Sequence, residues 1–389
     1  MSVDDWTLYA RDEVTFERVA EIDDYRAFEM VSRFNAVGTW RIDIPASALA
    51  ASYLSHTHVH GGEEVWHPNG LVAVRLDGTT FSGPITDVER RWDASSDMLT
   101  IQGLTDDVWL ARRLAYPEAP ALTTATNAYD VRTGTASTVM RAFVENNAGP
   151  SANVDRRVAG LTCAADPGLG SSVTGRGRFQ LLDELLRELA LSGGDLGFRV
   201  VQVDGGIEYQ TYSPTDRSTT ALFGEEFGNL RAFTYSQRCS EANFVVVGGG
   251  GEGVARTFVS GGDAAQIDEH GRIETFRDGR DTTDATELAQ RREETLDEQG
   301  LRTSLSITPV DTEALAFGAG YGLGDTVTVV IDDETIRDEV REVRVVLSPD
   351  GETVIPVVGS PGERDPRVPL LFRRLSEVRS RISDLERRR

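Results

Sequence analysis

The chain has 389 residues with a formal net charge of −23, and every one of its 40 basic residues is arginine. The absence of lysine excludes a Walker A phosphate loop, a Schiff-base enzyme and a Ser-Lys nucleophile. The acidic balance disfavours binding to nucleic acid or to anionic lipid, because like charges repel.

The first hundred residues have the pattern of antiparallel strands and hairpins. Trp40, Ile42 and Ile44 alternate with polar residues, which is the period of a half-buried strand. Asp77-Gly78 is a strong signal for a two-residue hairpin turn. This spacing predicts a closed or nearly closed antiparallel β-barrel over residues 1–105. Strands are expected at 40–44, 71–76 and 98–103.

Residues 106–250 mix helical and extended patterns and are expected to form an α+β domain. The clearest helix covers 179–190, where five leucines make one apolar face before Gly193-Gly194 ends the helix. Whether strands of this domain complete the first barrel is left open at this point. A second helix is expected at 133–147, and strands are expected at 197–203, 207–212, 230–235 and 243–247.

Strands return in the last part of the chain. Residues 251–302 indicate a connecting segment with a polar helix at 288–299. Residues 303–360 predict a second β-barrel domain, with strands at 304–308, 325–331, 341–347 and 353–358. The predicted fold is therefore multidomain and mainly β, with two tube-like antiparallel barrels and an α+β insertion.

The C-terminal segment, residues 361–389, joins a Pro/Gly/Arg linker to a short coiled-coil pattern. Its apolar residues follow the 4-3-4-3 spacing of an a/d seam. The predicted oligomerisation seam consists of Leu371, Leu375, Val378, Ile382 and Leu385. Because short helices are marginal alone, we expect a parallel bundle on the axis of a body that already oligomerises. The alternative is an amphipathic helix packed on its own domain.

Three histidines that lie close together in the sequence are weak candidates for a metal site. They are His56, His58 and His60. In an extended segment they share one face, and Glu63 or Glu64 could complete the ligand set. The alternative is a polar loop that tolerates histidine, and Gly61-Gly62 favours such a loop.

The sequence shows no catalytic constellation. The glycine run at 248–253 lacks the Gly-Lys-Ser/Thr of a phosphate loop. Among 63 acidic residues, adjacent pairs such as Asp106-Asp107 and Glu225-Glu226 are expected to be solvated surface. The segment 278–281 indicates a turn or a surface ion-pair cluster. We therefore expect neither enzyme activity nor a cofactor, and the sequence has no apolar run long enough for a membrane span.

A series of short motifs follows a specific order along almost the whole chain. The motifs are Leu8–Asp12, Glu21–Tyr25, Arg33–Trp40, Phe81–Pro84, Ala111–Pro117, Tyr129–Gly134, Asn146–Pro150, Gly197–Arg199, Pro214–Ser218, Gly228–Leu230 and Leu323–Val327. Over residues 6–359 this order resembles the minor tail protein family of long-tailed siphoviruses. That family is similar to phage baseplate hub proteins and to N-terminal tail-associated proteins.

The resemblance implies a structural protein of the virion. Hub proteins of this kind form a homotrimer at the distal end of the tail, and each chain contributes two tube-like barrels. Three chains then present a pseudo-sixfold ring to the hexameric distal tail protein. The resemblance also implies a channel for the tape-measure protein and DNA, contacts with receptor-binding or tip proteins, and roles in host attachment and genome ejection. Assembly is expected in the cytoplasm of the host.

Two other functions compete with the hub. One is an envelope glycan-degrading enzyme, and the other is a carbohydrate- or receptor-binding tail protein with exposed aromatic residues such as Trp66 and Trp92. For the hub we expect acidic residues along the channel, because they do not capture phosphate, and hence no specific nucleic-acid binding. The composition suits a high-GC actinobacterial or a halophilic archaeal host.

Overall fold

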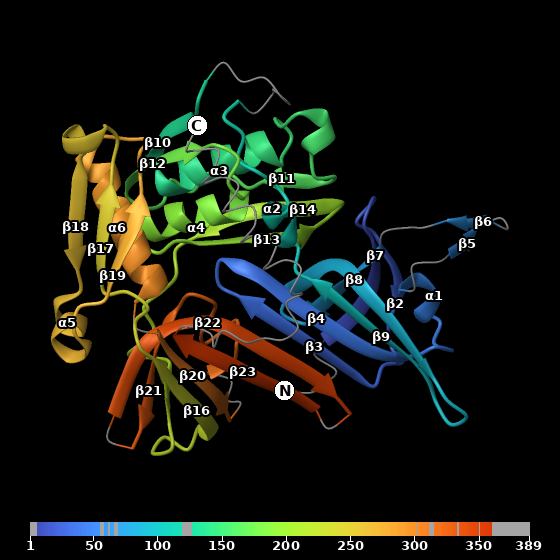
Figure 1. The fold of residues 1–389 in the computed structure, drawn as a ribbon. Helices are drawn as coiled ribbons and strands as arrows, with labels where there is room; N and C mark the ends of the chain where they lie inside the picture. Colours follow the sequence, from blue (N-terminus) through green and yellow to red (C-terminus); the bar gives the residue numbers. More distant parts are fainter. Residues whose placement is uncertain are drawn as a thin grey trace. The chain divides into compact units, whose positions relative to one another are not determined.

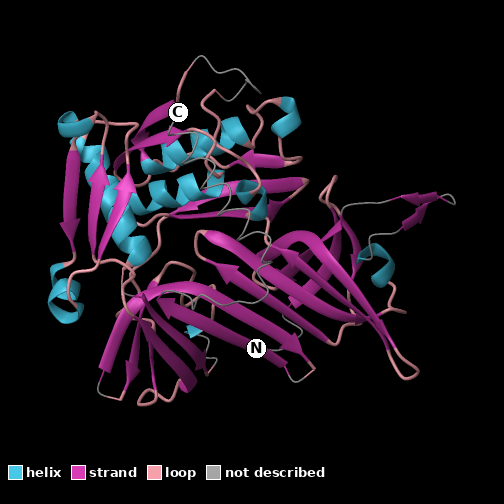
Figure 2. Cartoon of the chain, viewed as in Figure 1, coloured by secondary structure: helices cyan, strands magenta, loops and turns pink. Residues whose placement is uncertain are grey.

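The structure is a computed structural model that describes residues 6–54, 58–60, 63–65, 69–118, 127–300, 302–310, 315–332, 334–349 and 351–359. It is mainly β, with a few helices (Figures 1 and 2). The chain forms two compact units. The first contains the described residues up to Ala232 and those of Ile307–Val357, and the second is built from Phe233–Ser306 and the described residues of Val358–Gly362.

A large sheet, antiparallel in nearly all of its pairings, dominates the first unit. Its strands are β1 (Trp6–Asp12), β2 (Arg18–Glu21), β3 (Ala27–Arg33), β4 (Ala36–Pro45), β7 (Asn69–Arg75), β8 (Thr80–Trp92), β9 (Asp97–Leu104), β15 (Leu222–Gly224), β16 (Leu230–Arg238), β20 (Arg302–Pro309), β21 (Thr326–Ile331), β22 (Glu334–Ser348) and β23 (Gly351–Gly359). The strand order is β16-β20-β23-β22-β3-β4-β9-β8-β7-β1-β2, and β21 pairs with β22 and with β15. The boundary between the two units falls within β16 and β20.

The predicted strands at the start of the chain are confirmed. Trp40, Ile42 and Ile44 on β4 are buried, whereas Arg41 on the same strand is exposed. The turn between β7 and β8 contains Gly78 with a φ of 85°, a conformation that favours glycine. Alternation of apolar and polar residues therefore located both the strands and their buried face.

An early strand and a late strand of the chain pair directly, namely β3 and β22. The pairing is antiparallel, and it sets Glu342 opposite Arg33 and Leu347 opposite Phe28. Arg33 Nε donates to Glu342 Oε2 at 2.7 Å, so an ion pair reinforces the backbone ladder. The strands at the start and at the end of the chain thus belong to one sheet.

This single sheet differs from the expectation of two closed or nearly closed barrels at 1–105 and 303–360. In the described part of the chain no barrel closes, and β2 and β16 stand at opposite ends of the strand order. The physical reason is that the long strand β22 pairs with β3 through residues 342–347 and with β21 through residues 334–339. The later strands also recruit β15 and β16, which lie far earlier in the sequence.

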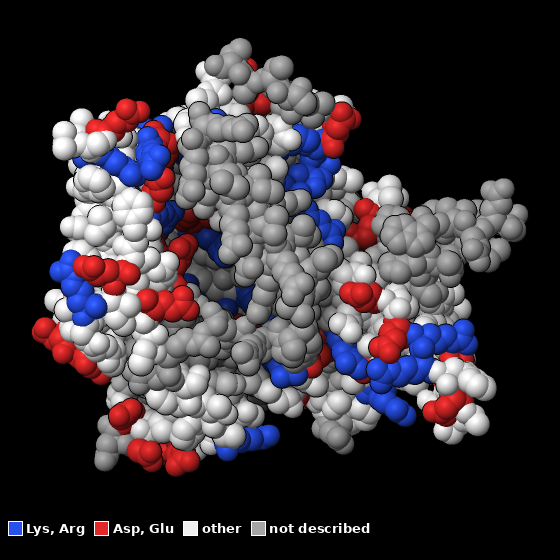
Figure 3. All heavy atoms as spheres, viewed as in Figure 1, with Lys and Arg blue, Asp and Glu red and all other residues white. Residues whose placement is uncertain are grey.

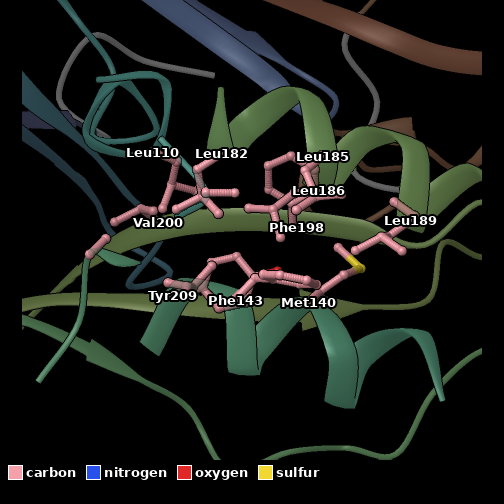
Figure 4. Packing of buried hydrophobic residues seen from close by; sticks show 14 of the residues in the cluster. Leu110, Met140, Phe143, Leu182, Leu185, Leu186, Leu189, Phe198, Val200 and Tyr209 are labelled. Atoms are coloured by element: carbon pink, nitrogen blue, oxygen red, sulfur yellow. The ribbon is translucent and has the colours of Figure 1, made fainter. Parts of the chain in front are cut away.

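An α+β module, residues 106–212, follows the first strand group. Its elements are α2 (Val108–Ala111), β10 (Asp130–Thr135), α3 (Ala136–Asn147), the 3-10 helix η2 (Val154–Arg156), β11 (Leu161–Cys163), β12 (Ser172–Gly177), α4 (Leu182–Ser192), β13 (Gly197–Val203) and β14 (Gly206–Tyr212). The strands form a two-stranded sheet, β10-β12, and a three-stranded sheet, β11-β14-β13. Leu185, Leu186 and Leu189 of α4 point towards Met140 and Phe143 of α3 in the core (Figure 4).

Two predicted helices differ from the observed ones at their ends. The expected helix at 133–147 begins only at Ala136, because Thr133 and its neighbours pair with β12 as part of β10. The expected helix at 179–190 is α4, which begins at Leu182 and has Gly193 as its C-cap. Four of the five leucines of the predicted apolar face are buried on α4.

The second unit is a small layered structure. Its elements are β17 (Phe244–Gly248), the 3-10 helix η3 (Gly253–Ala255), β18 (Phe258–Gly262), α5 (Ala264–His270), β19 (Glu274–Asp278) and α6 (Ala285–Gln299). The strand order is β18-β17-β19. Leu288 of α6 packs against Val245 and Val247, so α6 covers one face of this sheet. Asp284 caps α6 by accepting from the backbone N–H of Thr286 at 2.8 Å.

Three short elements complete the described chain. They are α1 (Ala51–Leu54), β5 (His58–His60) and β6 (Glu63–Val65). None of the helices that the structure describes is both long and apolar enough to cross a membrane.

The core between α3 and α4 yields a stability prediction. Leu186 is fully buried there, so Leu186→Ala is expected to lower the free energy of unfolding by about 2–5 kcal/mol through lost burial and a cavity. Urea denaturation followed by circular dichroism measures the change. Val154→Ala, at a position 71% exposed in the same module, is the matched control and should change stability by less than about 0.5 kcal/mol. Equal losses in both variants would contradict the assigned core.

Candidate functional site

A fully buried arginine connects the large sheet to the α+β module. Arg11 on β1 is 0% exposed, and its Nη1 and Nη2 donate to the two carboxylate oxygens of Asp106 at 2.7 and 2.8 Å. Its Nε donates to Glu13 at 2.8 Å, and Nη1 also donates to Gln202 of β13 at 2.7 Å. We call Arg11, Glu13, Ser82, Asp106 and Gln202 the Arg11 junction.

The absence of a side chain at Gly70 leaves room for this junction. Arg11 lies opposite Gly70 in the β1–β7 pairing, and a Cβ at Gly70 would come within 1.9 Å of a Glu13 carboxylate oxygen. Ser82 of β8 donates its hydroxyl hydrogen to Asp106 at 2.6 Å. Three strands and the segment before α2 therefore converge on one guanidinium group.

Two further contacts hold β13 against the sheet. Asp107 accepts from the backbone N–H of Val200 at 2.8 Å and from the Thr105 hydroxyl at 3.0 Å. Asn35, at the turn between β3 and β4, donates to the carbonyl oxygen of Leu196 and accepts from the N–H of Phe198, both at 2.8 Å. The α+β module is thus fixed to the sheet by a row of polar contacts as well as by apolar packing.

Burial changes the acid–base properties of this region. Burial raises the pKa of Glu13 to about 7, although the charge of Arg11 opposes the shift. It also raises the pKa of Asp107 to about 7, against the two hydrogen bonds that this carboxylate accepts. Burial alone acts to lower the pKa of Arg11, but Asp106 and Glu13 outweigh that effect and raise it. Glu13 Oε2 is buried without a hydrogen-bond partner, which suits a carboxylic acid that keeps its proton near neutral pH.

The predicted metal site is not tested by the structure. His58 and His60 lie on β5, where Glu63 of β6 stands opposite His60, but their side chains lie outside the described residues, as does His56 altogether. Among the side chains that are described, no group of three or more potential ligands is close enough to bind a metal. The histidine site therefore stays a prediction.

The predicted oligomerisation seam also stays a prediction. Leu371, Leu375, Val378, Ile382 and Leu385 all lie in the C-terminal segment, outside the described residues.

The predictions for the acidic pairs have different outcomes. Asp106-Asp107 was expected to be solvated, and this is wrong because Asp106 is fully buried against Arg11. Glu225-Glu226 is exposed, as expected. The segment 278–281 does form ion pairs, since Asp281 binds Arg291 through two contacts of 2.5 and 2.6 Å.

Sequence reasoning missed the Arg11 junction. Arg11 and Asp106 are 95 positions apart, so no local spacing relates them. Alternation along β1 places Arg11 on the face opposite Leu8 and Ala10, where an arginine is ordinary, so the local sequence carried no signal of its burial.

Tryptophans divide between the core and the surface. Trp40 is buried, and Trp109 packs partly buried against the core of the α+β module. Trp92, at the end of β8, is 73% exposed. Trp66 lies outside the described residues.

Comparison with known proteins identifies relatives. A family model described as Siphovirus ReqiPepy6 Gp37-like protein matches residues 6–360. No curated protein matches the sequence.

Three solved structures share the fold. A tail protein from Neisseria meningitidis MC58 is 15% identical, with a TM-score of 0.56 over 92% of this chain and 97% of that one. The 43 kDa tail protein of prophage MuSo2 from Shewanella oneidensis is 11% identical, with a TM-score of 0.53 over 90% and 98%. The prophage tail protein gp18 from Listeria monocytogenes EGD-e is 10% identical, with a TM-score of 0.51 over 92% and 95%.

Removing the cation from the junction should destabilise the protein strongly. Arg11→Met leaves the buried Asp106 carboxylate without its counter-ion, so we expect the free energy of unfolding to fall by about 3–5 kcal/mol. Urea denaturation measures the loss. The control Arg41→Met removes an exposed ion pair with Asp43 from the same sheet and should cost less than about 1 kcal/mol. Similar losses in the two variants would show that burial of the pair is unimportant.

Stability should also fall as the pH rises through neutrality. The folded protein holds protons on Glu13 and Asp107 up to about pH 7, whereas ordinary unfolded carboxyl groups lose theirs near pH 4. Between these values the folded state binds more protons, so the free energy of unfolding decreases with increasing pH. We expect the urea midpoint to be higher at pH 5.5 than at pH 8.

Glu13→Gln provides the control for this pH effect, because an amide does not titrate. The slope of the urea midpoint against pH should become shallower in this variant. An unchanged slope, or a midpoint that rises with pH in the unmodified protein, would exclude Glu13 as the source.

Proposed function

The chain belongs to the family of Siphovirus ReqiPepy6 Gp37-like proteins, a siphovirus tail protein family, and on this premise we propose that it is the hub of the tail. In this proposal three chains form a ring at the distal end of the tail that closes the tail tube. The single observation that carries the proposal is the family match over residues 6–360. The fold, shared with phage tail proteins over at least 90% of both chains, agrees with it.

In this proposal two strand groups of the large sheet account for the pseudo-sixfold symmetry of the ring. A trimer that faces a hexameric partner needs two similar surfaces per chain, about 60° apart around the axis. The strand group β1–β9 and the group formed by β15, β16 and β20–β23 meet at the β3–β22 pairing. We propose that these two groups act as the two tube-like walls that each chain contributes.

One face of the sheet suits a channel wall. On this face Arg344 pairs with Glu29 at 2.8 Å, and Arg41 pairs with Asp43 at 3.0 Å. Arginines that are already paired with carboxylates are poor ligands for a passing phosphate backbone. We propose that this polar face surrounds the channel for the tape-measure protein and DNA without specific nucleic-acid binding.

The proposed role is structural and not enzymatic. The ring would join the hexameric distal tail protein to the receptor-binding or tip proteins in the assembled virion, and so contribute to host attachment and genome ejection. One observation favours the alternative of a carbohydrate- or receptor-binding tail protein, namely the exposed Trp92 at the end of β8. Trp92→Ala would abolish binding to host envelope glycans under that alternative, and should leave the trimer intact under either.

The mass of the purified protein in solution tests the hub proposal. Size-exclusion chromatography with light scattering should give the mass of three chains. A stable monomer at micromolar concentration would contradict the ring.

Substitutions in the predicted C-terminal seam test whether that seam stabilises the trimer. Leu375→Asp with Ile382→Asp introduces two charges at seam positions, so we expect dissociation of the trimer to shift to concentrations about tenfold higher or more. The matched control is Ser376→Asp with Ser383→Asp, which adds the same charges at the next positions outside the seam. An equal shift in both variants would assign the effect to charge rather than to the seam.

A further inference from the structure

Three arginines of the α+β module differ from most arginines of this acidic chain. Arg112 and Arg113 follow α2, and Arg156 ends η2. In the described part of the chain, no carboxylate lies within ion-pair distance of any of the three. Elsewhere arginines such as Arg33 and Arg291 are paired with carboxylates. The three positive charges therefore lack direct counter-ions.

The side chains of Arg113 and Arg156 each donate a hydrogen bond to the backbone at or next to the other arginine. Arg113 Nε donates to the backbone carbonyl oxygen of Arg156 at 2.7 Å, and Arg156 Nη2 donates to that of Leu114 at 2.6 Å. The Arg156 guanidinium also lies over the ring of Tyr116, with 3.6 Å from its Cζ to the ring centroid. Arg113 Nη1 also donates to the Arg112 carbonyl oxygen at 3.2 Å, and Arg156 Nη2 also donates to Asn147 Oδ1 at 3.3 Å. Backbone oxygens, an amide oxygen and an aromatic face thus hold the two guanidinium groups.

Hydrogen bonds fix the backbone at Arg113 and Ala115. The Arg113 carbonyl oxygen accepts from the N–H of Leu182 at 2.9 Å, and the N–H of Ala115 donates to Gln180 at 2.9 Å. Arg112 lies over the ring of Trp109, with 5.1 Å from its Cζ to the centroid. The three guanidinium groups are therefore positioned in advance, which lowers the entropic cost of binding a ligand.

One donor of the cluster is buried without a partner. Arg156 is only 8% exposed, and its Nη1 has no hydrogen-bond partner. Burial lowers the pKa of Arg113 and of Arg156, and each is lowered further by a neighbouring arginine, Arg112 and Arg113 respectively. Burial also lowers the pKa of Arg112, against the more distant charge of Glu13. An unpaired buried donor and mutual repulsion are costs that a bound anion would remove.

We propose that Arg112, Arg113 and Arg156 form a binding site for a phosphate-class oxyanion. Guanidinium groups present planar pairs of N–H donors that match the oxygens of phosphate. Three cations favour a multiply charged tetrahedral anion over a single carboxylate, because the anion neutralises more of their repulsion. Figure 3 shows that basic side chains, all of them arginines, lie beside acidic side chains on several parts of the face that it draws.

In this proposal the counter-ion is either a free phosphate or a phosphoryl group on a larger molecule. The site does not depend on the proposed role as a hub.

Calorimetric titration of the full chain with inorganic phosphate at pH 7 and constant ionic strength tests the site. We expect one binding event per chain, weakened about tenfold or more in Arg112→Gln and in Arg113→Gln, since each removes a charged donor. The Arg112 side chain stacks on the Trp109 ring. If Arg113→Gln fails to fold, Arg112→Gln alone still tests the site.

The control removes the same charge from the same module. Arg187→Gln breaks an exposed pair with Asp183 on α4 and should change phosphate affinity by less than about twofold. No heat beyond that of equimolar sodium chloride, equal affinity for acetate, or equal weakening in Arg187→Gln would overturn the proposal.

Two further ligands identify the source of the phosphate group. Glycerol phosphate represents a phosphomonoester, and a short single-stranded oligonucleotide represents phosphodiesters. Binding of the oligonucleotide that is lost in Arg112→Gln would support a phosphodiester ligand. Binding of inorganic phosphate and glycerol phosphate alone would support a free or monoester dianion.

Discussion

The first unit depends on how a single buried cation is satisfied. Arg11 is fully enclosed, and a charged group in such a place is tolerated only when it is paired and hydrogen-bonded. Its partners come from the residue that follows β1, from the segment before α2 and from β13, so the large sheet and the α+β module must be in register before the guanidinium is satisfied. The junction therefore constrains how these two parts fit together, while most of the stabilisation comes from apolar burial.

Local sequence patterns predicted much of the fold, because they report which face of an element is buried. The alternation around Trp40 and the leucine face of α4 both describe contacts with the nearest core, and both were correct. The ends of helices were less predictable, since Thr133 joins β10 only because β12 is there to pair with it.

Long-range pairings could not be predicted in the same way. Nothing near Arg33 indicates that its partner is Glu342, and the merging of the two strand groups into one sheet follows from that pairing. The Arg11 junction was missed for the same reason. The acidic pair Asp106-Asp107 looked like solvated surface, because the counter-ion and donors that allow its burial lie far away in the sequence.

The β3–β22 pairing also has a consequence for the synthesis of the protein. The β22 edge of β3 cannot be covered until the ribosome has passed Leu347, close to the end of the described chain. Until then the nascent protein carries an open strand edge, which is a template for association with other chains. Contacts of such long sequence separation also slow folding. A chain that ends before β22 would lack this strand and would leave the edge of β3 open.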